Sequence, residues 1–358
     1  MNDGAMMLKQ ILFLLTGLVT LNGCSSGITP NIYSLCLRDD IGNYVIKWEI
    51  DPGMEGTMTL FVSDNPDNFN MSSPCAYADI DEGVVTYITN DNISRKYFLL
   101  SFNEKFKQIV GARSVSMDSI QNFRDIGGYQ SSDNKSVRWG KVFRSGELCA
   151  LSDLDTIRLN NLDIKTIIDL RGEDEITCAP DKYKKANIIS IPISRHGMDA
   201  VVERLEEDQM RKGDALLYMQ DTYLHFINED REQFSKALKI FLDKDNYPIV
   251  INCSVGKDRT GFLTAMLLAA LDVPEETIRK DYMASNDYTN ISQLAFMIRD
   301  MSTNSQEAIT ALVTANESFL DIVYRTIGKE YGSMDKFLSK GLHLSEKERD
   351  TLKDILLN

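Results

Sequence analysis

A strand, a cysteine and a helix follow one another over residues 247–271, and this order constrains the fold more than any other stretch. The apolar run 249–251 predicts a short buried strand. Cys253 comes next, five residues separate it from Arg259, and an apolar helix is predicted over 262–271. A cysteine at a helix N-terminus faces unpaired N–H groups and the positive end of the helix dipole. Both favour the thiolate, which is the nucleophilic form of the side chain.

The loop between Cys253 and Arg259 has the composition of a phosphate-binding nest. Its backbone N–H groups can turn inward, and Gly256 lets the chain curl because it has no Cβ. Arg259 can hold two phosphate oxygens bidentately, and the Thr260 hydroxyl can donate to the cysteine sulfur. The predicted phosphate-binding residues are Ser254, Val255, Gly256, Lys257, Asp258, Arg259 and Thr260. The alternative is an ordinary strand-to-helix turn with a buried cysteine and a surface arginine.

Residues 253–261, Cys-Ser-Val-Gly-Lys-Asp-Arg-Thr-Gly, resemble the catalytic loop of the bacterial tyrosine phosphatase family typified by the mycobacterial secreted tyrosine phosphatase B. Further segments match motifs of that family in the same order, namely residues 122–129, 142–148, 166–171, 281–287 and 330–334. The resemblance covers about residue 118 to the end of the chain. It implies an α/β fold, with a central parallel sheet between helices and the catalytic loop at the C-terminal end of a strand. Alternating helix and strand signals agree with this fold.

The resemblance also implies a two-step phosphoryl transfer. The Cys253 thiolate attacks phosphorus to give a phosphocysteine, which water then hydrolyses. The N–H nest and Arg259 stabilise the phosphate oxygens, so no cofactor is expected. No metal is predicted either, because the sequence has no cluster of His, Cys or carboxylate residues with the spacing of metal ligands.

Phosphotyrosine is the substrate that the resemblance favours. Phosphoserine and phosphothreonine are further candidate substrates. Phosphoinositides are candidates as well, because Lys257 would add positive charge where a polyphosphorylated ligand binds. Two alternatives stay open. One is a phosphatase for inositol phosphates or other small phosphate esters, and the other is an inactive module that binds phosphorylated or protein partners.

A carboxylic acid is the usual donor of the proton to the leaving oxygen, and two aspartates are candidates. Asp169 ends the Asp-Leu-Arg strand, at a position that the family motif carries. Asp258 lies between Lys257 and Arg259, whose charges favour its ionised form. We therefore favour Asp169 as the acid, with Asp258 positioning substrate or water. A structural ion pair between Asp169 and Arg171 is the alternative.

The sequence departs from the family at the residue before the cysteine, where Asn252 replaces the usual histidine. That histidine is thought to hold the loop and to favour the thiolate, whereas asparagine forms hydrogen bonds but cannot carry charge. We expect activity to be weakened or shifted in pH rather than lost. The chain's three histidines, His196, His225 and His343, lie outside the motifs and are expected to be structural.

Two further groups of residues are expected near the loop. A buried polar network that supports the loop, rather than contacting substrate, is predicted from Asn122, Arg124, Asp125, Arg144 and Ser145. The charged segment 199–208 is either a lid over the site or a solvated surface helix.

Residues 1–24 have the pattern of a bacterial lipoprotein signal. Lys9 precedes the apolar run 11–21, which is shorter than the about 20 residues that span a bilayer but suits a signal-peptide core. The sequence Leu-Asn-Gly-Cys ending at Cys24 resembles a lipobox, so we expect Cys24 to carry lipid and to anchor an exported chain to a cell-envelope membrane, on its periplasmic or outer-membrane face. A plain secretory signal is the alternative. The net charge of −14 argues against a nucleic-acid partner.

Residues 28–112 read as a β-sandwich that resembles a fibronectin type III or immunoglobulin-like module, with the catalytic domain in residues 113–358. Six strands are expected, over residues 33–37, 44–50, 57–62, 84–88, 97–102 and 108–110. We expect this module to act as a spacer between the lipid and the catalytic domain, or as a site of partner recognition.

The cysteines outside the loop leave several pairings open. Cys36 and Cys75 could form a disulfide in an oxidising compartment or stay as free thiols. Cys149 and Cys178 flank the Asp-Leu-Arg strand, and either could protect Cys253 as a reversible disulfide.

Overall fold

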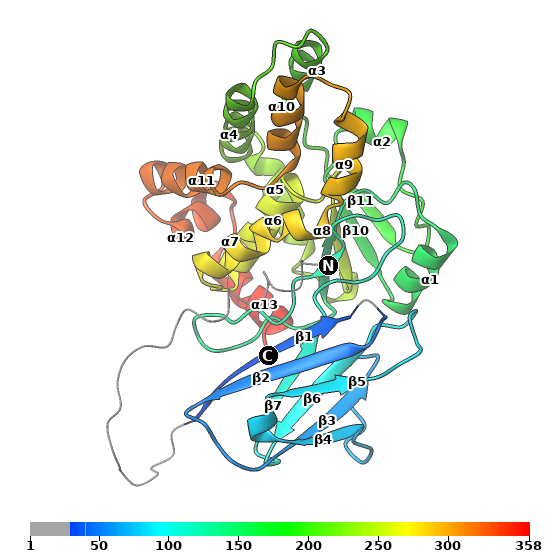
Figure 1. Ribbon diagram of the computed structural model, residues 1–358. Coiled ribbons are helices and arrows are strands. Elements are labelled where there is room, and N and C mark those ends of the chain that lie inside the picture. The colour runs from blue at the N-terminus through cyan, green and yellow to red at the C-terminus, as the bar shows by residue number, and fades with distance from the viewer. Residues whose placement is uncertain (1–28, 40) are drawn as a thin grey trace.

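The computed structural model describes residues 29–39 and 41–358, and it has two parts (Figure 1). Antiparallel sheets form the N-terminal part, and an α/β domain forms the rest. The predicted signal and Cys24 lie outside the described residues. None of the helices in the described ranges is long and apolar enough to cross a membrane.

The N-terminal part consists of two antiparallel sheets that share one hydrophobic core. One sheet has the order β1 (Asn31–Arg38), β2 (Tyr44–Asp51), β5 (Val84–Tyr87). The other has the order β4 (Ala76–Asp79), β3 (Thr57–Ser63), β6 (Tyr97–Phe102), β7 (Phe106–Gly111). All six expected strands form, and β4 is the one that the sequence analysis missed. In β2 the alternation sends Tyr44, Ile46 and Trp48 into the core.

The second part is built on a five-stranded sheet with the order β11–β10–β12–β9–β8. Its strands are β8 (Arg124–Asp125), β9 (Val142–Ser145), β10 (Thr166–Asp169), β11 (Asn187–Ser190) and β12 (Ile249–Asn252). Four of them are parallel, and β8 pairs antiparallel with β9. The expected parallel sheet is therefore mixed, because one short antiparallel strand closes its edge.

Helices cover this sheet and extend beyond it (Figure 1). They are α1 (Asp153–Asn161), α2 (Glu173–Cys178), α3 (Met198–Glu206), α4 (Lys212–Asn228), α5 (Arg231–Ile240), α6 (Arg259–Ala270), α7 (Glu275–Met283), α8 (Ser285–Tyr288), α9 (Ile291–Ile298), α10 (Thr303–Val313), α11 (Glu317–Glu330), α12 (Met334–Lys336) and α13 (Glu346–Leu356). Shorter helical turns are η2 (Ile80–Glu82), η3 (Lys244–Asn246) and η4 (Phe337–Gly341). Ser152 and Ser345 cap α1 and α13, each accepting from a backbone N–H of the first helical turn.

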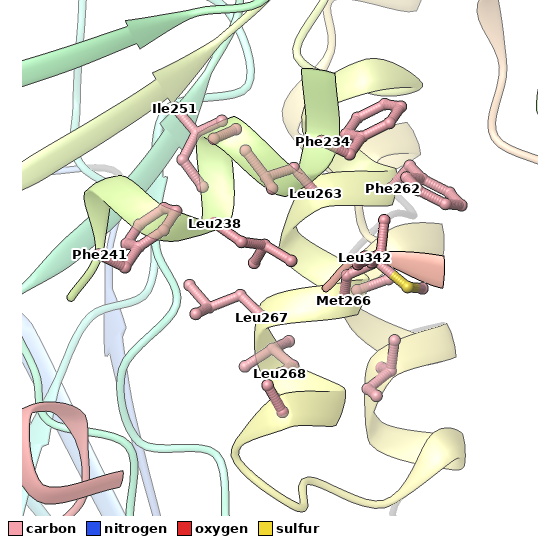
Figure 2. Close-up of a cluster of buried hydrophobic side chains, with 14 of the residues drawn as sticks. Phe234, Leu238, Phe241, Ile251, Phe262, Leu263, Met266, Leu267, Leu268 and Leu342 are labelled. Carbon is pink, nitrogen blue, oxygen red and sulfur yellow. The ribbon is translucent and has the colours of Figure 1, made fainter. Parts of the chain in front are cut away.

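Helix α6 lies at the centre of the α/β part. Its residues are apolar on every side, and all but one of them are buried. A helix of this kind needs cover on all faces. Figure 2 shows Phe262 beside Phe234 of α5, and Met266 beside Leu342. Because the whole of α6 is fixed by packing, the position of its first residue, Arg259, is fixed as well.

A buried ion pair joins the two parts of the chain. Arg95 Nη1, just before β6 of the N-terminal part, lies 3.1 Å from Asp125 Oδ2. Asp125 also accepts from the backbone N–H groups of Gly127 and Gly140, at 2.7 and 2.8 Å. Figure 1 places the antiparallel sheets of the N-terminal part at the end of the α/β part opposite α3 and α10.

No disulfide joins any pair of the five cysteines within the described residues. Cys36 is buried, and burial raises the pKa of its thiol to about 12. The structure therefore has free thiols at Cys36 and Cys75, which was the second of the two readings of the sequence. The proposed protective disulfides of Cys253 with Cys149 or Cys178 are not formed either.

Candidate active site

Cys253 follows β12 directly and is only 2% exposed, and Arg259 begins α6 after a tight loop. The loop turns at Gly256, whose φ of 74° is in the left-handed region. A Cβ at this position would lie 2.3 Å from the carbonyl oxygen of Ser145, so no other residue fits without moving the backbone. The strand, the loop and the helix are thus arranged as the sequence predicts.

Buried polar side chains hold the loop from behind. Arg144 donates to the carbonyl oxygen of Gly256 at 2.8 Å, and Asn122 donates to that of Val255 at 3.1 Å. Arg144 is also hydrogen-bonded to the buried carboxylate of Asp281. These contacts confirm the expected network for Asn122 and Arg144, and Arg124 joins it through Asn122 and Asp281, whereas in the described residues the Ser145 hydroxyl donates only to the carbonyl oxygen of Gly146. Asp125 is outside the network, because it lies at the junction with the N-terminal part instead.

Arg259 is bound on its outer edge by Glu175 of α2. Nη1 donates to Glu175 Oε2 at 2.6 Å, and Nη2 donates to Oε1 at 3.1 Å. Nη1 also donates to the carbonyl oxygen of Ile193 at 3.0 Å. Burial opposes ionisation of Glu175, but the hydrogen bonds and charge of Arg259 prevail and lower its pKa to about 2. Nη2 also donates to Ser254 Oγ at 2.8 Å, so both terminal nitrogens of Arg259 already have protein partners, and the expected bidentate hold on a phosphate would require some of them to be exchanged.

Glu175 was missed by the sequence analysis. Its contact to Arg259 joins residues that are far apart in the chain, and nothing in local spacing indicates it. The acidic run 173–175 indicates only the start of a helix, and Glu175 does serve there as well, accepting from the backbone N–H of Gly172 at 2.8 Å. Ser254 of the loop also donates to Glu175, so this carboxylate contacts both the loop and its arginine.

The two candidate acids have different surroundings. Asp258 lines the pocket in front of Cys253, and Tyr223 donates to its Oδ1 at 2.9 Å. Asp169 is 1% exposed, and both its oxygens accept from Arg171, at 3.0 and 2.8 Å. Asp169 is absent from the pocket lining in the described part of the chain. The structure thus forms the ion pair with Arg171 that was the alternative role of Asp169, and this geometry favours Asp258 as the acid, which stays a prediction.

Two further loop residues differ from expectation. Lys257 is buried, and its Nζ donates to the carbonyl oxygens of Leu312 and Thr314 at 2.6 and 3.1 Å, so it fastens the end of α10 and adds no exposed charge to the site. The Thr260 hydroxyl is buried and has no hydrogen-bond partner within residues 29–39 and 41–358. The predicted bond to the cysteine sulfur is therefore not formed here.

Asn252, which replaces the histidine of the family, is fully buried. Its side chain donates to Asp181 Oδ2 at 3.3 Å. Burial and the neighbouring charge of Asp169 raise the pKa of Asp181 to about 6. Asn252 thus joins the loop to the buried group of Asp169, Arg171 and Asp181 by a neutral hydrogen bond.

Cys253 and Arg259 lie in a pocket of about 290 Å³. Its other walls are largely apolar and come from α3, α4 and α10, with Met198, Leu205, Tyr218, Met219, Phe226, Ile309, Leu312 and Val313 among the lining residues. Segment 199–208 therefore contributes a wall residue to the pocket, Leu205, so it is not a wholly solvated surface helix, and its role as a lid stays a prediction. Small-molecule sites commonly combine apolar walls with a few polar groups in this way.

Comparisons with known proteins agree with this geometry. Residues 115–358 match the model of the tyrosine phosphatase family. A putative tyrosine-protein phosphatase of Cupriavidus necator is 28% identical over 240 residues, which cover 66% of this chain and 86% of that protein. The triple specificity protein phosphatase PtpB of Mycobacterium tuberculosis is 25% identical over 274 residues, covering 66% and 96%.

Among solved structures, the catalytic core of the yeast phosphatase SIW14 from S. cerevisiae is 17% identical and covers 57% of this chain and 98% of its own, with a TM-score of 0.29. A TM-score of 0.29 is too low to establish that the two chains share a fold. The family match spans more than half of the chain and includes the loop, the network and the pocket described above. The chain belongs to the tyrosine phosphatase family.

Proposed function

We propose that this phosphatase hydrolyses phosphotyrosine monoesters through a phosphocysteine on Cys253, with Asp258 as the general acid. The observation that carries the proposal is the pocket itself. Cys253 and Arg259 meet where the mostly apolar walls of α3, α4 and α10 close around a space of about 290 Å³. An aromatic ring fits such walls, and its phosphate would lie on the nest of loop N–H groups.

The reaction follows from the positions of the side chains. The Cys253 sulfur forms a bond to phosphorus as the bond from phosphorus to the tyrosine oxygen breaks, and Asp258 gives that oxygen its proton. Water then attacks phosphorus, Asp258 takes its proton, and the sulfur leaves as thiolate. Arg259 and the loop N–H groups stabilise the oxygens in both steps.

Substrates beyond phosphotyrosine form the second proposal. The relative PtpB is named a triple specificity protein phosphatase. In this chain, Lys257 Nζ donates to a carbonyl oxygen of α10 and lies 3.4 Å from Asp258 Oδ1, so its charge is already paired, which weakens the argument for polyphosphorylated ligands. Arg195 is the second cation that lines the pocket in the described residues, and it could meet a further phosphate. Phosphoinositides and inositol phosphates are therefore tested beside phosphopeptides.

Cysteine chemistry is tested by hydrolysis of p-nitrophenyl phosphate with and without chelator. We expect the activity to survive chelation and to vanish in Cys253→Ser, because serine is not ionised at neutral pH and cannot replace the thiolate. A phosphotyrosine peptide should be cleaved faster than phosphoserine peptides or inositol phosphates. A folded, reduced chain that is inactive across pH would favour the inactive binding module, and faster release from inositol phosphates would replace the proposed substrate.

The general acid is tested by leaving-group dependence. Asp258→Asn should lower kcat for phenyl phosphate by roughly 100-fold or more, because phenolate needs a proton. The loss should be much smaller for p-nitrophenyl phosphate, since nitrophenolate leaves without one. Asp169→Asn should lower both rates alike, through weaker support of the site. If Asp169→Asn alone shows the leaving-group dependence, the assignment is reversed.

Glu175 is expected to position Arg259. Glu175→Ala should lower kcat/KM for p-nitrophenyl phosphate by roughly 10- to 100-fold, because the guanidinium loses the contacts that orient it. Glu175→Gln, which keeps hydrogen-bonding atoms, should lose less. Glu173→Ala is the matched control, since Glu173 is exposed on the same helix. An increase in kcat/KM for Glu175→Ala would mean instead that the carboxylate competes with phosphate for the arginine.

We also propose that the chain is exported and held at a membrane by lipid on Cys24, with the fibronectin-like sandwich as a spacer. Support comes from the lipobox-like sequence before Cys24 and from the position of the sandwich at the end of the domain away from the pocket. The wild-type chain should take up a fatty-acid label in bacteria and sediment with membranes. Cys24→Ala should do neither, whereas Cys75→Ser should behave as wild type. A wild-type chain without label would refute the anchor.

A further inference from the structure

We propose that His196, His225, Glu229 and Asp230 form a binding site for a divalent transition metal of the zinc type, outside the phosphate site. The two histidine rings lie with centroids 4.6 Å apart and planes 12° from parallel. Ligand atoms of His196, His225 and Glu229 all lie within 4.8 Å of one another. Imidazole nitrogens and carboxylate oxygens are ligands that zinc takes from proteins.

Two pairs of ligand atoms already have the spacing of a zinc site. His196 Nε2 lies 3.4 Å from Asp230 Oδ2, and His225 Nε2 lies 3.4 Å from Glu229 Oε1. Zinc bonds of about 2.0 Å in a tetrahedron place neighbouring ligand atoms about 3.3 Å apart. Stacked rings cannot both point at one ion, so one of them must turn. The side chain of His196 is 32% exposed, which leaves it room to do so.

Buried atoms without hydrogen bonds point to a ligand at this place. In the described part of the chain, neither His196 Nε2 nor Asp230 Oδ2 has a hydrogen-bond partner, although both atoms are buried. Asp230 as a whole is only 6% exposed. The two atoms lie 3.4 Å apart without hydrogen-bond geometry, so their contact only partly replaces the water that both have lost. A metal ion would supply both atoms with a partner.

The local structure prepares His225 to bind through Nε2. Its Nδ1 lies 2.8 Å from the carbonyl oxygen of Asp221, which can only accept, so Nδ1 carries the proton and Nε2 keeps its lone pair. His225 lies in the last turn of α4, and Glu229 follows as the C-cap. The negative end of the helix dipole favours a cation there. His225 and Glu229 are four residues apart, which is the part of the site that the sequence could have revealed.

The site adjoins one wall of the pocket. Arg195, next to His196, and Phe226, next to His225, both line the pocket. Arg195 Nε also lies 3.5 Å from Glu175 Oε2, the carboxylate that holds Arg259. A metal ion would join the segment before α3 to the end of α4 and so restrain Arg195. Binding itself does not depend on the proposed phosphatase activity.

Zinc binding is measured on the full chain carrying Cys253→Ser, purified with a tag free of histidine, so that neither the catalytic thiolate nor the tag contributes ligands. Equilibrium dialysis should find one zinc ion per chain, and Tm should rise with zinc concentration. Cobalt(II) in place of zinc should give the visible absorption of a nitrogen and oxygen site. Absence of binding, or a thiolate-to-cobalt charge-transfer band from one of the remaining cysteines, would overturn the proposal.

Two variants test whether the zinc ion binds at the proposed residues. His225→Ala and Asp230→Asn should each weaken zinc binding by roughly tenfold or more. Asparagine at 230 keeps a good N-cap residue before α5, so this variant guards against loss of binding through misfolding. His343→Asn is the matched control, because His343 is exposed and has a φ of 52° that asparagine tolerates. Unchanged affinity in both site variants, or an equal loss in the control, would show that the ion binds elsewhere.

Discussion

The phosphate loop depends on one buried carboxylate, that of Asp281. It is hydrogen-bonded to Arg144 and lies 3.5 Å from Arg124 Nε, and both arginines are fully buried. Burial opposes its ionisation, but the two arginines prevail and lower the pKa of Asp281 to about 2. Removal of one partner from such a group typically costs about 3–5 kcal/mol, because the remaining charges are left unpaired. The group is therefore a strong constraint on what surrounds it.

This constraint reaches the reacting atoms in two steps. Arg144, held by Asp281, donates to the carbonyl oxygen of Gly256, and that bond leaves the N–H groups of the loop to turn toward the phosphate. On the other side, α6 is buried along its whole length and fixes the start of the helix at Arg259. Loop and arginine are thus held from opposite directions before substrate arrives. Such preorganisation is the main source of electrostatic stabilisation in enzymes.

The sequence predicts the parts of this site that depend on local order. The strand, the cysteine, the glycine at positive φ and the helix follow one another, so their arrangement is set by short-range geometry. Glu175, the direction of Lys257 and the pairing of Asp169 depend instead on which distant segments meet. Asp169 and Asp258 are alike as residue types, and only the packing shows that Arg171 encloses one while the other faces the pocket. The pair of His196 and His225 was hidden for the same reason.

The charges around the loop explain how an acidic chain can hold a phosphate. The net charge of −14 repels anions at long range. Close to the loop, Glu175 neutralises one edge of Arg259 and Lys257 is turned toward α10, so few uncompensated side-chain cations face the pocket. Attraction must then come from the backbone N–H groups and from the charge of Arg259, whose terminal nitrogens already donate to Glu175 and Ser254, and both act only over a few ångströms. Recognition therefore depends on how well a phosphate monoester fits the nest, with the apolar walls holding the group that carries it.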